Sequence, residues 1–136
     1  MDLRKLNESI IEEFRTHAGK VGGRFANATL LLLTTKGAKS GLPRLNPLAY
    51  FKDGNRYLII ASYAGAPGNP PWYYNLLANP EASVEMGTEK FNVRAEVLGE
   101  PERTKQYARI AAAVPAFAEY QSKTERTIPM LALYRV

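Results

Sequence analysis

The chain has 136 residues and a net charge of +5, with no cysteine and one histidine. This length fits a single domain over residues 1–136, and a composition of 46% hydrophobic and 23% charged residues is ordinary for a globular protein. The absence of cysteine excludes disulfides and thiolate nucleophiles, and with a single histidine it also excludes the usual zinc sites, so we expect no metal. Any chemistry must therefore come from a bound ligand or from hydroxyls, carboxylates and lysines.

The basic excess is concentrated in one segment. Residues 14–80 contain eight basic side chains and a single acidic one, Asp53, which gives this segment a charge of +7, whereas the rest of the chain sums to −2. A positive surface potential of this kind attracts polyanions, which include nucleic acid, an acidic membrane surface and a phosphorylated small ligand. The charge by itself does not choose among these three.

Residues 2–19 are expected to form an N-terminal amphipathic helix, with Asp2 as its N-cap and Gly19 after its last turn. Its apolar positions, at three- and four-residue spacing, are Leu3, Leu6, Ile10 and Phe14. Such a stripe more often packs on its own domain, and peripheral contact with the inner face of the cell membrane is the alternative. No apolar run approaches the roughly 18 residues of a membrane span, so we expect a cytoplasmic protein.

The rest of the chain alternates between strand and helix signals. Six strands are expected, at residues 28–35, 43–51, 56–62, 82–86, 91–98 and 127–135. Three further helices are expected, at residues 71–77, from 102 to about 114 and, as one turn, at 117–123. Pro43 and Pro47 cannot donate ladder hydrogen bonds and favour an edge strand, and Pro115 is expected to break the third helix. This order predicts an α+β domain whose strands close into a small barrel, with an open sheet as the alternative.

The first candidate site is the stretch TTKGAKSGLPRLNPL at residues 34–48. Two glycines bound a turn whose backbone can approach a ligand closely, and its N–H groups and the Ser40 hydroxyl can point at an anion. Lys39 and Arg44 add cations, and Arg44 and Asn46 share a face if the chain is extended there. Two interpretations stay open, an anion-binding turn and a hairpin whose charges face water.

The second candidate is the stretch NPPWYYN at residues 69–75. Trp72, Tyr73 and Tyr74 are adjacent, so on a helix they cannot all face one core, and at least one should border a cleft or solvent. Aromatic faces and amide groups suit a planar heterocycle, and they equally suit RNA bases.

The third candidate lies near the C-terminus. Phe117, Tyr120 and Gln121 share one face of a helical turn, which can cap a pocket or pack on the last strand, and the spacing favours packing. Ser62, at the end of the third expected strand, is a small polar residue without distinctive neighbours.

Several motifs occur together in this order. They are LLTTKGAKSGLPRLNPL at residues 32–48, AS at 61–62, NPPWYYNLLANP at 69–80 and TERTIP at 124–129. From Ala28 onward the chain thereby resembles the deazaflavin-dependent nitroreductase family. The resemblance implies a split β-barrel, like that of FMN-binding proteins, with about six mostly antiparallel strands and flanking helices. It also implies coenzyme F420 as cofactor, with hydride transfer from its reduced deazaflavin to an electron-poor small molecule, namely a quinone, an enone or a nitroaromatic compound.

The resemblance also assigns site residues. For the phosphate and polyglutamate tail of the cofactor it implies Ala38, Lys39, Ser40, Arg44, Leu45 and Asn46. Along the deazaflavin ring it implies Ala61, Ser62 and Tyr63, and as walls of the same pocket Trp72, Tyr73 and Asn75. Phe117 and Tyr120 are expected in the substrate pocket, and Ser62 and Tyr120 are the expected catalytic hydroxyls, acting by hydrogen bonding or proton delivery.

The chain departs from the family members that activate nitroimidazoles. Those members have tyrosines where this chain has Val114 and Phe117, and a basic residue where it has Tyr63, which argues against nitroimidazole reduction. Two alternatives to an F420 enzyme stay open. One is the same barrel with FMN, and the other, less favoured, is a single-stranded nucleic-acid-binding module that stacks bases on residues 72–74.

Overall fold

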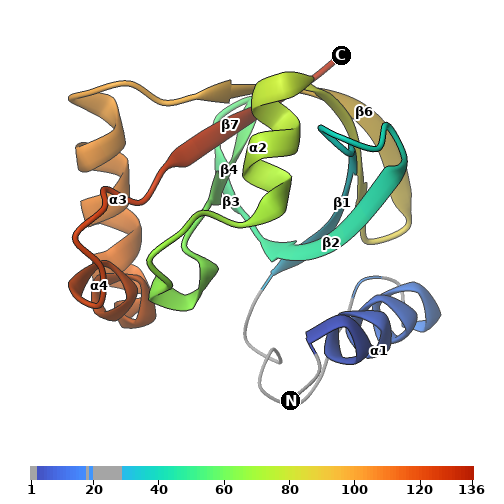
Figure 1. The fold of residues 1–136 in the computed structure, drawn as a ribbon, viewed down its shortest axis with the longest axis horizontal. Coiled ribbons are helices and arrows are strands. Elements are labelled where there is room, and N and C mark those ends of the chain that lie inside the picture. The colour runs from blue at the N-terminus through green and yellow to red at the C-terminus, as the bar shows by residue number, and fades with distance from the viewer. Residues whose placement is uncertain (1–2, 18, 20–28) are drawn as a thin grey trace.

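The structure is a computed structural model that describes residues 3–17, 19 and 29–136. The expected N-cap Asp2 and the expected start of the first strand at Ala28 lie outside this range. The strands of the described chain form one curled antiparallel sheet, with helices at its open end and on its outer face (Figure 1).

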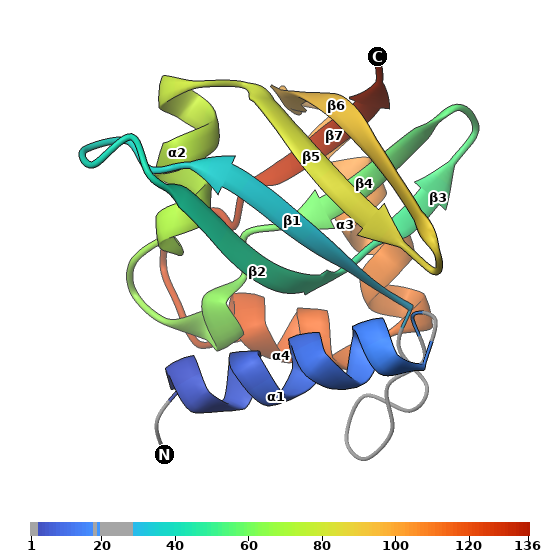
Figure 2. The ribbon, with the colours of Figure 1, turned by 90° about the vertical axis from the view of Figure 1, so that its right-hand side faces the viewer.

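The sheet has seven strands in the order β2-β1-β5-β6-β7-β4-β3, and every neighbouring pair is antiparallel. The strands are β1 Leu30–Lys36, β2 Pro43–Ala49, β3 Phe51–Asp53, β4 Arg56–Ile60, β5 Glu81–Met86, β6 Glu89–Val97 and β7 Met130–Arg135. β2 also contacts β4, so the two ends of the sheet approach each other and the sheet is a half-barrel (Figure 2).

The expected strand at residues 43–51 is two strands in the structure. The break lies at Tyr50, whose backbone N–H donates to the carbonyl of Thr29 at 3.1 Å, beyond the β1–β2 ladder. β2 and β3 therefore lie at opposite edges of the sheet. The edge position of β2 confirms what Pro43 and Pro47 predicted, because an edge strand needs no hydrogen-bond donor on its outer side.

The leucine run at the start of β1 is buried throughout because both faces of this strand are covered. Leu31 and Leu33 point inward, where Trp72 and Leu76 pack against them. Leu30 and Leu32 point outward against the N-terminal helix. A third cluster lies between β4, β7 and the C-terminal helices, with Leu58, Met130, Tyr107, Ile110 and Ile128 at its centre.

Four α-helices accompany the sheet. They are α1 Leu3–Thr16, α2 Pro71–Ala78, α3 Glu102–Ala113 and α4 Pro115–Ser122, and the short 3-10 helix η2 spans Tyr63–Gly65. α3 ends one residue before Val114, and Pro115 begins α4, so the break expected at this proline is confirmed. α4 is longer than the single turn that the sequence predicts, because a proline fits the first turn of a new helix.

α1 packs along the outer face of β1 and β2 (Figure 2). Ile10 and Phe14 are 6% and 1% exposed and pack on Leu30 and Leu32. Arg15 adds a two-point ion pair with Glu85 of β5, at 3.2 Å from Nε to Oε1 and 2.9 Å from Nη2 to Oε2. Leu6, Ile10 and Phe14 of the apolar stripe thus pack on the sheet of the same chain. None of the described helices combines the length and apolar character that a membrane crossing requires.

Replacing Phe14 by alanine should lower the free energy of unfolding by about 3–5 kcal/mol, because the ring is buried and leaves a cavity between α1 and the sheet. Urea denaturation followed by circular dichroism measures this. Lys5→Ala, an exposed change on the same helix, should stay within about 0.5 kcal/mol of the unaltered protein. Equal stability of the two variants would show that α1 is not docked as described.

Candidate functional site

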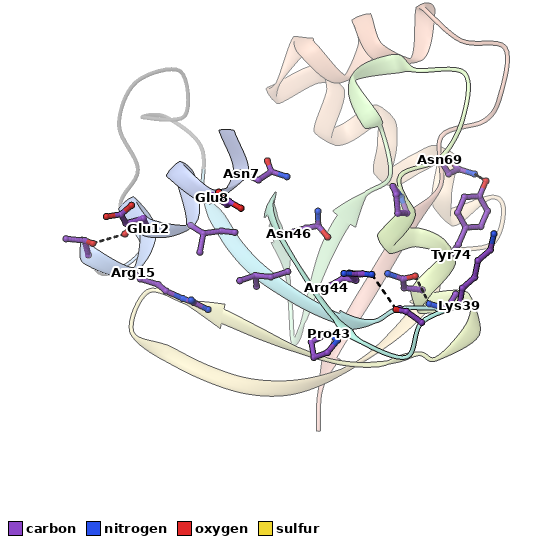
Figure 3. Close-up of a pocket in the computed structure, with 18 residues that line it drawn as sticks. Asn7, Glu8, Glu12, Arg15, Lys39, Pro43, Arg44, Asn46, Asn69 and Tyr74 are labelled. Atoms are coloured by element: carbon purple, nitrogen blue, oxygen red, sulfur yellow. Dashed lines mark hydrogen bonds between the residues drawn. The ribbon is translucent and has the colours of Figure 1, made fainter. Parts of the chain in front are cut away.

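A pocket of about 1180 Å³ lies between α1, the turn after β1, β2 and the start of α2 (Figure 3). Seven of the residues expected to bind a cofactor line it, and they are Ala38, Lys39, Ser40, Arg44, Leu45, Asn46 and Asn75. Arg44 and Asn46 alternate along β2 and therefore share a face of the strand, and the residues between and before them, Leu45 and Pro43, also line the pocket. We call this space the turn pocket.

The turn at residues 37–42 is closed by its own hydrogen bonds. Gly37 N–H donates to the carbonyl of Leu42 at 2.8 Å, and Gly41 N–H donates to the carbonyl of Gly37 at 2.9 Å. The Ser40 hydroxyl accepts the Leu42 N–H at 3.2 Å, so part of its capacity serves the turn. A Cβ on Gly37 would lie 2.6 Å from Ser40 Oγ, and Gly41 has φ +70°. Gly41 is therefore favoured by its left-handed backbone, and a side chain at residue 37 would displace the Ser40 hydroxyl from its present place.

Asn75 holds the turn against α2. This side chain is 7% exposed; its Oδ1 accepts the Ala38 N–H at 2.9 Å, and its Nδ2 donates to the Thr35 hydroxyl at 3.0 Å. The bond to Ala38 joins the first and second candidate sites, which are far apart in the sequence. Sequence reasoning missed Thr35, because a threonine inside a buried strand gives no local signal of a tertiary partner.

The turn has the donors that an anion needs. Ala38 N–H is taken by Asn75, but the backbone N–H groups of Lys39 and Ser40 donate to no acceptor among the described residues. Lys39 and Arg44 are exposed beside them. Among the described residues, the Arg44 guanidinium makes one hydrogen bond, a long one of 3.5 Å to Ser40 Oγ. Free amides together with two cations fit a phosphate or a carboxylate group.

The opposite wall of the turn pocket is acidic. Glu8 and Glu12 of α1 line it and are exposed, and Arg15 lies on the same wall (Figure 3). Arg15 is paired with Glu85. The pocket therefore has cations at the turn and carboxylates at the helix, which favours a ligand whose negative end faces the turn. The sequence did not indicate this wall, because α1 reaches it only through tertiary packing.

A second pocket, of about 440 Å³, adjoins the first, since Asn7 lines both. We call it the aromatic pocket. Phe117 and Tyr120 of α4 line it with their rings 5.8 Å apart, and Phe51 lies 5.7 Å from Phe117. Both interpretations of this group hold, because the two side chains also pack on the third core cluster. Gln121 instead accepts a hydrogen bond from Arg103 at 2.8 Å.

Tyr50 is a hydroxyl-bearing residue of the aromatic pocket that sequence reasoning missed. It lines the aromatic pocket and packs edge-on against Tyr57 at 5.7 Å. Burial, followed by the neighbouring Tyr57, raises the pKa of Tyr50 above its ordinary value. The phenol is therefore neutral near pH 7 and can donate a proton or a hydrogen bond.

The three adjacent aromatic residues of α2 divide as expected. Trp72 is 4% exposed and belongs to the inner core, and Tyr73 packs partly buried against the same core. Tyr74 is 49% exposed and borders the turn pocket. Trp72 and Tyr73 line neither pocket in this structure. Their role as cofactor walls stays a prediction.

The residues expected along a cofactor ring also lie outside the lining of these two pockets. Ala61 is fully buried at the end of β4, Ser62 is half-buried, and Tyr63 is 46% exposed. The Ser62 hydroxyl makes no hydrogen bond within the described chain. Arg126, which sequence reasoning assigned no role, hydrogen-bonds to the carbonyls of Ala61 and Ser62.

Comparison with known proteins identifies the family. The family model described as F420H(2)-dependent quinone reductase matches residues 7–134. An F420H(2)-dependent quinone reductase of Mycobacterium tuberculosis (strain ATCC 25618 / H37Rv) is 38% identical over 141 residues, which cover 99% of this chain and 91% of that protein.

Solved structures give the same result. One, described as an F420-H2 dependent reductase (FDR-A), has 39% identity and a TM-score of 0.69, and the match covers 76% of this chain and 92% of that one. Another, described as a domain-swapped dimer, has 36% identity and a TM-score of 0.71, and the match covers 96% of each chain. These likenesses confirm the split β-barrel and the F420 dependence that the motifs implied, with a quinone as the acceptor class. The chain belongs to the family of F420H(2)-dependent quinone reductases, which makes it an oxidoreductase that uses coenzyme F420.

Proposed function

We propose that this protein binds the phosphate and tail of coenzyme F420 in the turn pocket and a quinone in the aromatic pocket. The observation that supports this most strongly is the turn itself, where two free backbone N–H groups lie beside Lys39 and Arg44. The donor set fits an anionic cofactor, and the adjoining aromatic pocket fits a planar acceptor.

When bound, the reduced deazaflavin supplies the hydride. The chain supplies binding and orientation. Lys39 and Arg44 attract the anionic part, and Asn75 keeps the turn rigid so that its amides need no rearrangement on binding. Phe117 and Tyr120 exclude water and stack against the acceptor, because their rings line the aromatic pocket.

Two hydroxyls are proposed to assist the reaction, as the resemblance implies. Tyr120 lines the proposed quinone pocket, and its O–H can hydrogen-bond to a quinone oxygen or deliver a proton to it. Ser62 has a hydroxyl without a partner in the described chain, and we propose that, with Ala61 and Tyr63, it lies along the ring of the cofactor. Tyr50 competes with Tyr120 for the role of proton donor.

The proposal requires a small-molecule acceptor and no nucleic acid. We propose that the enzyme works in the cytoplasm, without membrane insertion of the apolar stripe of α1, because Ile10 and Phe14 of that stripe are buried on the sheet. A domain-swapped relative is described as a dimer, and the oligomeric state of this chain stays without a prediction.

Removing either cation of the turn should weaken the binding of coenzyme F420. Lys39→Ala and Arg44→Ala should each raise the dissociation constant about tenfold or more, because each loses a charge-assisted contact. Isothermal titration calorimetry measures this, with Lys52→Ala as control, since Lys52 is an exposed lysine of β3 that lines neither pocket. Normal affinity in both turn variants would show that the turn is a solvated hairpin. Stronger binding of FMN or single-stranded RNA by the unaltered protein would favour the alternatives.

Replacing Tyr120 by phenylalanine keeps the ring and removes the hydroxyl. If this hydroxyl delivers the proton, kcat for quinone reduction should fall about 10²-fold while KM changes little. Tyr50→Phe is the matched variant, because it removes a hydroxyl from the same pocket, and its kcat should stay near that of the unaltered enzyme. The reverse result would transfer the role to Tyr50.

A further inference from the structure

The loop after β4 has an unusual backbone. Tyr63, Ala64 and Gly65 have φ values of 48°, 55° and 80°, so three consecutive residues are in the left-handed region. Non-glycine residues rarely adopt this conformation, and they keep it only where their surroundings hold them. The loop also packs tightly on α4, since a Cβ on Gly65 would lie 2.9 Å from the carbonyl oxygen of Tyr120.

One side chain, Arg126, bridges the two ends of this loop. Before the left-handed turn, its Nη1 donates to the carbonyl of Ala61 at 3.3 Å and its Nη2 to the carbonyl of Ser62 at 2.9 Å. After the turn, its Nε donates to the carbonyl of Ala66 at 3.0 Å and its Nη1 to Oδ1 of Asn69 at 2.7 Å. None of the ion pairs among the described residues includes Arg126. Its bonding capacity is therefore used on the loop.

Arg126 is itself anchored to the C-terminal helices. Its carbonyl accepts a hydrogen bond from Gln121 Nε2 of α4 at 2.7 Å. Gln121 Oε1 accepts from the Ile128 N–H at 3.1 Å and from Arg103 of α3 at 2.8 Å. Arg126 thus ties the loop to α4, which also lines the aromatic pocket.

The loop leads directly to the turn pocket. Asn69 lines that pocket, and its Nδ2 donates to the Tyr74 hydroxyl at 3.4 Å. Ser62 lies at the other end of the loop. A shift of the loop would therefore change the position of the Ser62 hydroxyl and of one wall of the turn pocket together.

We propose that Arg126 is a positioning residue, whose planar guanidinium holds residues 61–69 around their left-handed turn. It thereby fixes Asn69 at the turn pocket and Ser62 where we propose that the cofactor ring lies. The loop requires the planar set of N–H donors of the guanidinium and not its positive charge, because the four acceptors lie on both sides of the turn and none is a carboxylate. The effect of Arg126 on the binding of coenzyme F420 rests on the proposed function, whereas its effect on the conformation of the loop does not.

Hydrogen exchange of the ligand-free protein tests the effect on the loop. The amides of Gly65 and Ala66, which donate to the carbonyls of Ser62 and Tyr63, should exchange about tenfold faster or more in both Arg126→Lys and Arg126→Gln, because local opening becomes easier. The β1 and β7 amides should be unchanged. Arg56→Gln is the matched control, since Arg56 makes comparable bonds with Asp53 and Glu102, outside both pockets. Full protection in the lysine variant, or unchanged exchange in both, would overturn the proposal.

Binding and turnover test the consequence for the site. With coenzyme F420, both Arg126 variants should raise the dissociation constant about tenfold, while Arg56→Gln leaves it unchanged even if its melting temperature falls as far. Normal binding and kcat in both Arg126 variants would overturn the positioning role. If the unaltered protein failed to bind coenzyme F420, the proposed function would fail, and the exchange experiment would still decide whether Arg126 holds the loop.

Discussion

The candidate site depends first on one buried amide. Asn75 accepts a hydrogen bond from the Ala38 backbone and donates one to Thr35, so a single side chain of α2 fixes both the end of β1 and the start of the turn. Both of its polar groups are satisfied within the protein, and a buried amide with an unmade bond is costly. Ala38 N–H is therefore directed at the protein, and the next two amides of the turn are the ones left for a ligand.

Two different kinds of packing then surround this turn. Inside the half-barrel, Trp72 and Leu76 fix α2, and with it Asn75, against the inner face of the sheet. Outside, Phe14 and the Arg15–Glu85 pair fix α1 against β1 and β5, and this helix closes the pocket from the other side. The pocket thus lies between two elements that are each held by the core, which keeps opposite charges on facing walls without direct contact between them.

The sequence predicted the fold well because its signals were local. The four leucines of β1 and the proline at residue 115 each act on their own neighbours, and the elements they predict are present. The split at Tyr50 was missed, because it depends on a hydrogen bond to Thr29 beyond the ladder. In the site, residue types and spacing indicated Lys39, Ser40, Arg44 and Asn46 as candidates for an anion site, and the family resemblance added Ala38 and Leu45. Sequence reasoning missed Thr35, the acidic wall of α1 and the guanidinium of Arg126. Each acts through a partner more than 20 residues away, which local patterns do not reveal.

The prolines of β2 have a further consequence for association between molecules. A sheet edge presents unpaired backbone donors and acceptors that can pair with the edge of another chain, and this is a common start of aggregation. A proline keeps its place in the β1–β2 ladder only where its nitrogen points away from β1, so Pro43 and Pro47 remove donors from the outer side of β2. The edge that borders the turn pocket is therefore open to a small ligand and poorly suited to pairing with a foreign strand.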